Sequence, residues 1–214
     1  MKIVLGLGNP GPGYAAHRHN IGFWCVERLA RRLRIRLRKE DRNVHQAVGQ
    51  VGGVPVVVAK AMTMMNASGR AARCLLDWHG ETANGLIVVH DDVDLELGVV
   101  KVKDGGGHGG HNGLRSIIDS LGSRDFARVR IGVGRPESCR VDLADWVLSG
   151  FEASERDEAE RMAEWAVDAA EAIVTEGVRG AMSCFNRAPG NEPVGRKPGA
   201  ESKTQSSQRV RKDR

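Results

Sequence analysis

The 214-residue sequence predicts an α/β fold: a single-domain, three-layer sandwich in which helices flank a mixed, partly parallel β-sheet. Short apolar runs typical of buried strands alternate along the chain with segments of helical periodicity, the order expected where helices join parallel strands. Two strand-like runs are separated only by Gly52-Gly53, a pair that favours a tight hairpin turn. The hairpin adds antiparallel pairing, so the predicted sheet is mixed.

The first part of the chain supplies a strand, a helix and this hairpin. The apolar run Lys2–Leu7 predicts a buried strand, and the Gly- and Pro-rich residues 8–19 predict a loop. Apolar residues at helical spacing predict a helix over Ile21–Leu33. The runs Gln46–Val51 and Val54–Lys60 form the hairpin, and the valines of the second run indicate a strand buried on both faces.

The second part of the chain repeats the alternation. Asn66 is a favoured N-cap residue and is expected to open a helix that continues to about Trp78. The remaining predicted elements are strands at Leu86–His90, Val99–Lys103 and Val129–Val133, a helix from the glycine-rich stretch Gly105–Gly113 to about Leu121, a long helix capped by Ser154 and ending near Glu176, and a short helix ending near Arg187.

The composition indicates a protein of the reducing cytosol. No apolar run approaches the ~18 residues of a membrane span, and the N-terminus lacks the pattern of a signal peptide. No C-x-x-C pair occurs, so we expect reduced thiols and a cytoplasmic location. The four cysteines are Cys25, Cys74, Cys139 and Cys184.

The positive charge is concentrated at the C-terminus. Residues 188–214 hold seven basic and three acidic residues, a net charge of +4, so residues 1–187 carry only +1 of the total of +5. We expect residues 1–187 to form the domain and residues 188–214 to be a basic, disordered tail. Because the tail largely sets the charge, and aromatic residues make up only 4% of the chain, composition alone does not predict a nucleic-acid-binding sheet.

One glycine motif resembles a nucleotide site without fitting it. Gly6-Leu7-Gly8-Asn9-Pro10-Gly11 has the G-x-G-x-x-G spacing of a dinucleotide-binding turn. Such a turn needs a helix to begin at once, so that free N–H groups face the pyrophosphate. The prolines and glycines of residues 10–13 lack an N–H group or disfavour a helix. The sequence therefore does not predict nucleotide binding here.

Unusual polar residues gather where the predicted strands end, and ligands of open α/β sheets bind beyond the carboxyl ends of strands. Taken singly, each has an ordinary structural explanation. His19 suits a surface loop, Asn66 a helix cap, the glycines a flexible loop, and the aspartates a solvated turn. The four polar segments are Asn9 to Asn20, Met65-Asn66, His90 to Asp94, and Gly105 to Gly113.

In combination these segments resemble the bacterial peptidyl-tRNA hydrolase family. The glycine/histidine run that ends in His111-Asn112-Gly113-Leu114-Arg115 is highly specific, as is the spacing from Asn9-Pro10-Gly11 to Arg18-His19-Asn20. The resemblance stays in order from residue 2 to about 187. The other matching stretches are Gly6-Leu7-Gly8, Tyr14, Ile21-Gly22, Met65 to Gly69, His90 to Asp94, and Arg130 to Pro136.

The resemblance implies a metal-free esterase that hydrolyses the bond between a peptide and the 3′ ribose of its tRNA. It assigns activation of the attacking water to His19, whose ordinary pKa suits a general base. It assigns orientation of that imidazole to Asp91, whose charge is expected to raise the pKa of His19. Because no Ser or Cys is implicated, we expect direct attack by water without an acyl-enzyme.

Neutral amides suit the remaining tasks, because they donate and accept hydrogen bonds without reading the peptide's side chains. Asn9, Asn66 and Asn112 are expected to bind the peptide main chain; Asn112 is also expected to help position the water, and Asn9 to polarise the ester carbonyl. Met65 would form an adaptable apolar wall, and Tyr14 would contact the terminal adenosine.

Lys103 and Arg130 match family positions linked to the 5′ phosphate of the tRNA. Phosphate contacts are expected rather than base readout, because all tRNAs are substrates. The implied partners are the acceptor stem and 3′ CCA end of the tRNA and the peptide main chain. We expect a monomer with no membrane partner, no cofactor and no metal.

Two positions depart from the family pattern. His17 stands where the family usually has a small hydroxyl residue, which brings a second imidazole close to His19. Residues 61–64 read Ala-Met-Thr-Met, where the family usually has Pro and Phe. The first departure bears on the titration of His19, and the second on the wall of the pocket.

Two other functions compete with this interpretation. One is a non-catalytic RNA-binding relative built on the same fold; retention of His19, Asp91 and the three asparagines argues against it. The other is a metallohydrolase, although the H-x₂-H pair lies in a glycine loop and no H-E-x-x-H motif occurs. Its candidate ligands are His90, Asp91, Asp94, His108 and His111.

Overall fold

Seven strands form one mixed sheet in the computed structural model, which describes residues 1–138 and 140–186. The sheet order is β2-β3-β4-β1-β5-β7-β6. The four inner strands β4, β1, β5 and β7 run parallel, and β3 and β6 pair antiparallel at either side. The strands are β1 (Lys2–Gly6), β2 (Arg38–Lys39), β3 (Val44–Val51), β4 (Val54–Ala61), β5 (Leu86–Asp92), β6 (Val100–Asp104) and β7 (Ala127–Gly132).

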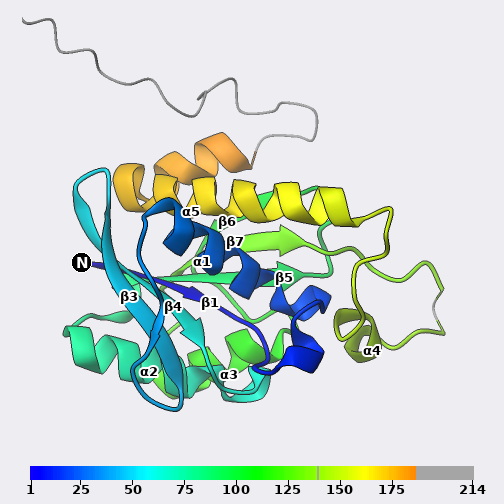
Figure 1. The fold of residues 1–214 in the computed structure, drawn as a ribbon, viewed down its shortest axis with the longest axis horizontal. Helices are drawn as coiled ribbons and strands as arrows, with labels where there is room; N and C mark the ends of the chain where they lie inside the picture. The colour runs from blue at the N-terminus through cyan, green and yellow to red at the C-terminus, as the bar shows by residue number, and fades with distance from the viewer. Residues whose placement is uncertain (139, 187–214) are drawn as a thin grey trace, which may run out of the picture.

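Helices cover both faces of the sheet, which gives the three predicted layers (Figure 1). Helices α1 and α5 pack on one face, over a core that includes Val4, Val56 and Val89. Helices α2 and α3 pack on the other face, over Ile3, Val57 and other strand residues. The helices are α1 (Ile21–Arg32), α2 (Ser68–His79), α3 (Asn112–Leu121), α4 (Leu143–Val147) and α5 (Arg156–Phe185).

The predicted α/β sandwich with a mixed sheet is therefore confirmed. Both turn glycines of the β3–β4 hairpin, Gly52 and Gly53, have positive φ, the conformation that a two-residue hairpin turn requires. Helix α5 buries an alanine-rich stripe at helical spacing and is interrupted at Gly177, whose φ is 78°. Figure 1 shows the chain changing direction there, so the predicted long helix and following short helix are both present.

Three local expectations were wrong. Asn66 caps no helix, because Met65–Ala67 forms a 3₁₀ turn and α2 begins at Ser68. Ser154 is not the N-cap of α5, which follows Glu155. The strand predicted at 129–133 begins earlier, because Ala127 and Arg128 also pair with β5 and β6.

Two short elements, β2 and α4, were not predicted, because each is too brief to show a periodicity. None of the described helices combines the length and apolarity that a membrane crossing needs. The expected tail, residues 188–214, lies outside the described residues and stays a prediction.

Candidate active site

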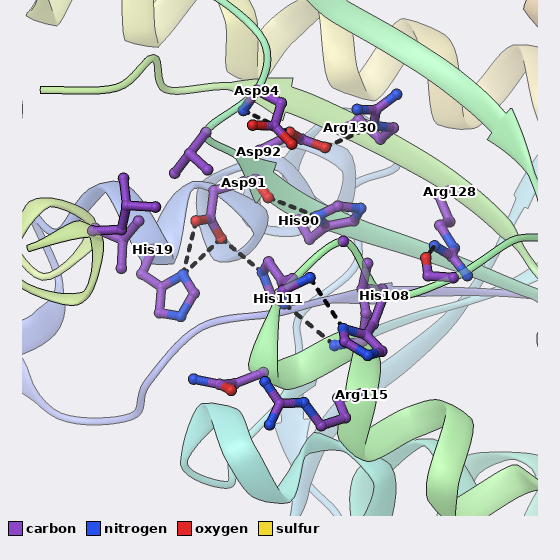
Figure 2. A pocket seen from close by; sticks show the side chains of 18 of the residues that line it. His19, His90, Asp91, Asp92, Asp94, His108, His111, Arg115, Arg128 and Arg130 are labelled. Atoms are coloured by element: carbon purple, nitrogen blue, oxygen red, sulfur yellow. Dashed lines mark hydrogen bonds and ion pairs between the residues drawn. The ribbon is translucent and has the colours of Figure 1, made fainter.

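The polar segments meet at the carboxyl-terminal end of the sheet, because the four parallel strands all end there. Asn9 follows β1, Met65 follows β4, and Asp91 lies at the end of β5. A cavity of about 390 Å³ opens at this end beside β5, β7 and the glycine-rich loop (Figure 2). The predicted site residues that line it are His19, Asp91, Lys103, Asn112 and Arg130.

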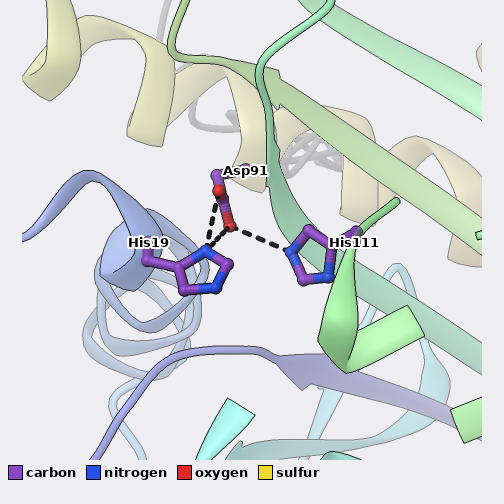
Figure 3. Close-up of side chains that lie close together, drawn as sticks. All are labelled: His19, Asp91 and His111. Atoms are coloured by element: carbon purple, nitrogen blue, oxygen red, sulfur yellow. Dashed lines mark hydrogen bonds and ion pairs between the residues drawn. The ribbon is translucent and has the colours of Figure 1, made fainter. Parts of the chain in front are cut away.

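His19 and Asp91 form a buried pair, although 72 residues separate them in sequence. The imidazole Nδ1 lies 2.8 Å from each carboxylate oxygen of Asp91. Burial by itself lowers the pKa of His19, but the charge of Asp91 and its hydrogen bond outweigh burial, so the pKa is raised above its ordinary value. Because Nδ1 is the nitrogen that faces Asp91, the neutral ring carries its lone pair on Nε2, which points away from the carboxylate (Figure 3).

His111 is a second partner of Asp91, with Nε2 at 3.1 Å from Oδ1. Its Nδ1 accepts hydrogen bonds from the backbone N–H groups of Gly113 and Leu114, so His111 is the N-cap of α3. An acceptor nitrogen carries no proton, so Nε2 carries it and donates to Asp91. The same geometry therefore selects the Nε2–H tautomer of His111.

His90 completes a cluster of three rings, with ring centroids 4.9 Å apart between His90 and His111 and 5.1 Å apart between His19 and His111. Its Nδ1 donates to the backbone oxygen of Asp91 at 2.6 Å, while its buried Nε2 has no partner in the described part of the chain. Burial and the neighbouring His111 lower the pKa of His90 to about 3, so this ring is neutral at physiological pH. With both carboxylate oxygens of Asp91 bonded to histidines, burial is outweighed and its pKa is held far below the usual range.

The side chain of Asn9 is held so that its amide nitrogen is left available. Asn9 Oδ1 accepts from the backbone N–H of Met65 at 2.8 Å. Asn20 clamps the Asn9 backbone, accepting from its N–H at 2.8 Å and donating to its oxygen at 2.9 Å. Because Oδ1 is engaged, Nδ2 is the free group, and it has no hydrogen bond to another described residue.

The structure places the other predicted residues around this centre in different ways. Asn112 begins α3 and is exposed, with its side chain at the cavity. Asn66 is exposed and follows the buried Met65 in the 3₁₀ turn Met65–Ala67. Tyr14 is half-buried and lies edge-on to His17, with ring centroids 5.3 Å apart. Four of the predicted site residues do not line the cavity itself: Asn9, Tyr14, Met65 and Asn66.

Basic side chains line the end of the cavity formed by β6 and β7. Arg130 Nε donates to Asp92 at 2.7 Å, a bond that outweighs burial and lowers the pKa of Asp92. Arg128 is buried and donates to the backbone oxygens of Gly106 and Gly107, which ties the glycine loop to β7. Burial, with a smaller contribution from Arg130, lowers the pKa of Arg128 to about 10.

Arg18 connects the 3₁₀ turn Arg18–Asn20, which contains His19, to α4. The sequence did not predict this contact. The side chain of Arg18 is 1% exposed. The guanidinium donates to both carboxylate oxygens of Glu155 at 2.6 and 3.2 Å and stacks 3.8 Å from the ring centroid of Trp146. Its backbone N–H also donates to the oxygen of Ser149 at 2.9 Å. The α4 residues Leu143, Ala144 and Val147 line the cavity, so Arg18 ties a wall of the cavity to the residue next to His19.

The described residues contain one group of three side chains that could bind a metal ion. Potential ligand atoms of His19, Asp91 and His111 lie within 4.8 Å of one another. A metal on His111 Nε2 would have to displace the proton that its helix-capping Nδ1 requires there. Asp94 instead pairs with Arg135, with 2.6 Å between Nη2 and Oδ1. The donor set therefore fits a hydrogen-bonded network better than a metal ion.

Comparison with known proteins identifies the family. A sequence profile described as peptidyl-tRNA hydrolase matches residues 3–193. The chain belongs to the peptidyl-tRNA hydrolase family. These are hydrolases that act on esters, so the prediction of an enzyme is confirmed.

Relatives match over most of their length. The peptidyl-tRNA hydrolase of Syntrophotalea carbinolica is 43% identical over 186 residues, which cover 87% of this chain and 97% of that protein. That of Leifsonia xyli subsp. xyli is 45% identical over 188 residues, with the same coverage. The crystal structure of the Acinetobacter baumannii enzyme superposes with a TM-score of 0.79 at 34% identity, covering 86% of this chain and 93% of that one.

The dinucleotide interpretation is excluded by the local structure. After β1 the chain forms only short 3₁₀ turns, and the next α-helix begins at Ile21. The first turn of α1 packs against Gly6 and Gly8, but it does not continue directly from Gly11, so the strand–turn–helix order of a dinucleotide site is missing.

Proposed function

We propose that this chain hydrolyses the ester bond between the peptide of peptidyl-tRNA and the 3′ ribose, with His19 as the general base. The observation that carries the mechanism is the bond from His19 Nδ1 to Asp91, which leaves Nε2 as the proton acceptor. Water activated at Nε2 attacks the ester carbonyl, and the ribose oxygen leaves. A positioned general base typically contributes roughly 100- to 10,000-fold in rate.

Asn9 is proposed to stabilise the oxyanion of the tetrahedral intermediate. Its Nδ2 is the free donor of a side chain that Met65 and Asn20 hold in place. A fixed donor is effective because it needs no reorganisation when charge develops on the carbonyl oxygen. His111 supports the same reaction indirectly, since its Nε2–H donates to Asp91 and helps to keep that carboxylate ionised.

Substrate binding is assigned to residues around the cavity. We propose that Asn66 and Asn112 bind the peptide main chain, that Met65 forms an apolar wall, and that Tyr14 contacts the terminal adenosine. Lys103 and Arg130, beside the basic end of the cavity, are proposed to bind the 5′ phosphate of the acceptor stem. The reaction needs no cofactor, and the cytoplasmic, monomeric state of the protein stays a prediction.

The decisive experiment measures release of an N-acylated amino acid from N-acyl-aminoacyl-tRNA in the presence of EDTA. We expect the wild type to cleave the substrate and His19→Ala to lose almost all activity. His45→Ala is the matched control, because His45 lies on β3 away from the cavity. Tight tRNA binding without cleavage by the wild type would contradict the proposal and favour a non-catalytic RNA-binding relative. Loss of wild-type activity in EDTA would favour a metallohydrolase.

A further inference from the structure

The positive charge of the domain is concentrated in one short segment. Residues 31–42 hold seven basic and two acidic residues, a net charge of +5. Because residues 1–187 carry +1 in total, the rest of the domain carries −4. A domain of nearly neutral net charge is therefore strongly polarised, with its positive pole between the end of α1 and the start of β3.

Six basic side chains of this segment are exposed and have no ion pair or side-chain hydrogen bond in the described part of the protein. We call them the basic edge. In contrast, Arg32 in the same segment pairs with three acidic residues of α5. The basic edge consists of Arg31, Arg34, Arg36, Arg38, Lys39 and Arg42.

The backbone displays these cations in a row. The apolar Leu33, Ile35 and Leu37 alternate with the arginines and pack against the core under α1 and α5. The burial pattern follows this alternation, with the apolar side chains partly buried and Arg34, Arg36 and Arg38 exposed. Figure 1 shows this segment beside β3, along the outside of the sheet.

Arg34 occupies a backbone conformation that favours glycine. Its φ is 57°, and no other non-glycine residue in the described part of the chain has a positive φ. Helices α2 and α3 end in the same left-handed conformation with Gly80 and Gly122. At this corner α1 therefore carries an arginine where the backbone alone would select glycine, which indicates a use for the side chain.

The strands next to the basic edge carry little unpaired positive charge. Lys39, His45 and Lys60 lie in register on β2, β3 and β4. Partial burial and the nearby charges of Lys60 and Lys39 lower the pKa of His45. His45 is therefore neutral at physiological pH, and Lys60 pairs with Glu27, so the unpaired positive charge stays within the basic edge.

Protection of a sheet edge explains only part of this pattern. Charged residues on edge strands prevent pairing with other chains. However, β2 has only two residues, and four members of the basic edge lie outside it. Three of them precede the strand and one follows it: Arg31, Arg34, Arg36 and Arg42. Their charges therefore do not block pairing at an exposed strand edge.

We propose that the basic edge is a second RNA-contacting surface, which binds a phosphate backbone outside the cavity. Sheet order places β2 four positions from β5, so the edge lies about 19 Å from the His19–Asp91 pair for strands about 4.8 Å apart. Five of its six members are arginines, whose planar guanidinium groups bind phosphate oxygens in pairs. A shallow hollow of about 420 Å³ lies within this surface, and its polar lining is Arg36, Arg38, Gln46 and the acidic Glu40.

The test uses two triple variants with the same charge change. The first is Arg34→Gln/Arg36→Gln/Arg38→Gln. The control is Arg70→Gln/Arg124→Gln/Arg179→Gln, because these arginines are also exposed and have no ion pair in the described residues. Both variants are made in the full chain, so both keep the basic residues of 188–214. The probe is a labelled RNA duplex of about 20 base pairs, measured over a range of salt concentrations.

We expect the basic-edge variant to bind the duplex at least about tenfold more weakly at low salt, with the salt slope reduced by about two to three. The control should stay within about twofold of the wild type. Hydrolysis of a short N-acyl-aminoacyl ester of CCA should be unchanged in both variants. Duplex binding requires no catalysis, so failure of the proposed hydrolysis would leave this result unaffected.

Two supporting outcomes distinguish the source of the RNA. If KM for full-length N-acyl-aminoacyl-tRNA rises in the basic-edge variant alone, the surface holds the substrate's own tRNA. If that KM is unchanged while duplex binding is lost, the surface binds a separate RNA.

Three outcomes would overturn the proposal. Equal loss of duplex binding in both triple variants would mean that only net charge matters. Unchanged duplex binding with new dimers in light scattering would leave edge protection as the sole role. Unchanged duplex binding with reduced binding to phosphatidylserine vesicles would identify a membrane contact instead.

Discussion

Asp91 receives hydrogen bonds from two histidines that differ in the proton each can carry. His19 faces the carboxylate with Nδ1, and its other nitrogen is free to gain or lose a proton. His111 faces it with Nε2, while its Nδ1 is committed to the N-terminus of α3. One carboxylate is therefore shared between a ring whose second nitrogen is free and a ring whose second nitrogen caps a helix. This division makes His19, rather than His111, the candidate base.

Asp91→Asn should move the acid limb of the activity profile. A general base must be neutral, so wild-type kcat/KM is expected to rise with pH through the raised pKa of His19 and then level off. Without the carboxylate, burial remains and lowers that pKa, so the limb should shift to lower pH while the plateau falls roughly 100- to 10,000-fold. Asp94→Asn is the control, because Asp94 pairs with an exposed arginine. If kcat/KM of Asp91→Asn rises at the same pH as that of the wild type, the group that titrates in this pH range is not His19.

Asn9→Asp separates the two functions of the Asn9 side chain. The aspartate keeps an oxygen to accept from Met65 N–H but lacks the Nδ2 donor. We expect kcat to fall roughly 100- to 1,000-fold, as for loss of one oxyanion donor, with little change in thermal unfolding. Steady-state kinetics and a melting curve provide the check. Wild-type kcat in this variant would rule out the donor role.

At the scale of elements, the 3₁₀ turn of Arg18–Asn20 is fixed on both sides. Asn20 holds the loop after β1 through the Asn9 backbone, and Arg18 holds the segment that contains α4. His19 lies between these two anchors, so its position depends on loops distant in sequence. The packing of α2 against α3 is equally close, since a Cβ on Gly69 would lie 2.2 Å from Ser116 O.

Arg18→Met should disturb the active site, whereas Arg28→Met should not. Both arginines bind glutamates near the start of α5, and both lie over a tryptophan ring, but only Arg18 contacts the α4 segment. Displacement of a catalytic group by about 1 Å can cost roughly 100-fold in rate, and we expect a loss of this order in kcat/KM for Arg18→Met. Arg28→Met should stay within about twofold. Similar losses in the two variants would indicate a general effect on stability.

At the scale of the whole molecule, buried histidines link stability to pH in opposite directions. The pKa of His90 is lowered to about 3 in the folded protein. Below about pH 6.5 this histidine is therefore protonated in the unfolded chain but not in the fold, so the fold loses stability as pH falls. The raised pKa of His19 has the opposite effect. Its contribution to the free energy of unfolding is present at low pH and is lost as pH rises through that pKa. The depressed pKa of Asp91 adds a further loss at more acidic pH.

His90→Asn should reduce the acid sensitivity of the fold. Asn can keep a donor towards the Asp91 backbone oxygen but does not titrate. Between pH 7 and pH 5 we expect the free energy of unfolding of the wild type to fall by about 2 kcal/mol more than that of the variant. Urea unfolding at the two pH values measures the difference. Parallel losses would mean that His90 is not the group responsible.

The residues that periodicity and motif spacing could identify were those with local signals. The stripe of α5, the turn at Gly52-Gly53 and the strand ends at Asn9 and Asp91 are patterns within short windows of sequence. The pairing of His19 with Asp91 was also expected, but only through the family resemblance. Roles for Asn66, Tyr14 and Lys103 rest on that resemblance too and stay predictions.

Tertiary structure alone decided how the site is held together. Asn66 has the composition of a helix cap, yet a preceding 3₁₀ turn moves the helix start beyond it. His111 gains its fixed tautomer because a helix N-terminus and a buried carboxylate approach the same ring from different segments. Arg18 meets Trp146 and Glu155 across more than 120 residues of chain. The sequence by itself determined the layers, because buried residues recur at a fixed spacing in helices and strands. These contacts instead depend on how close distant segments come in space, which no local sequence pattern shows.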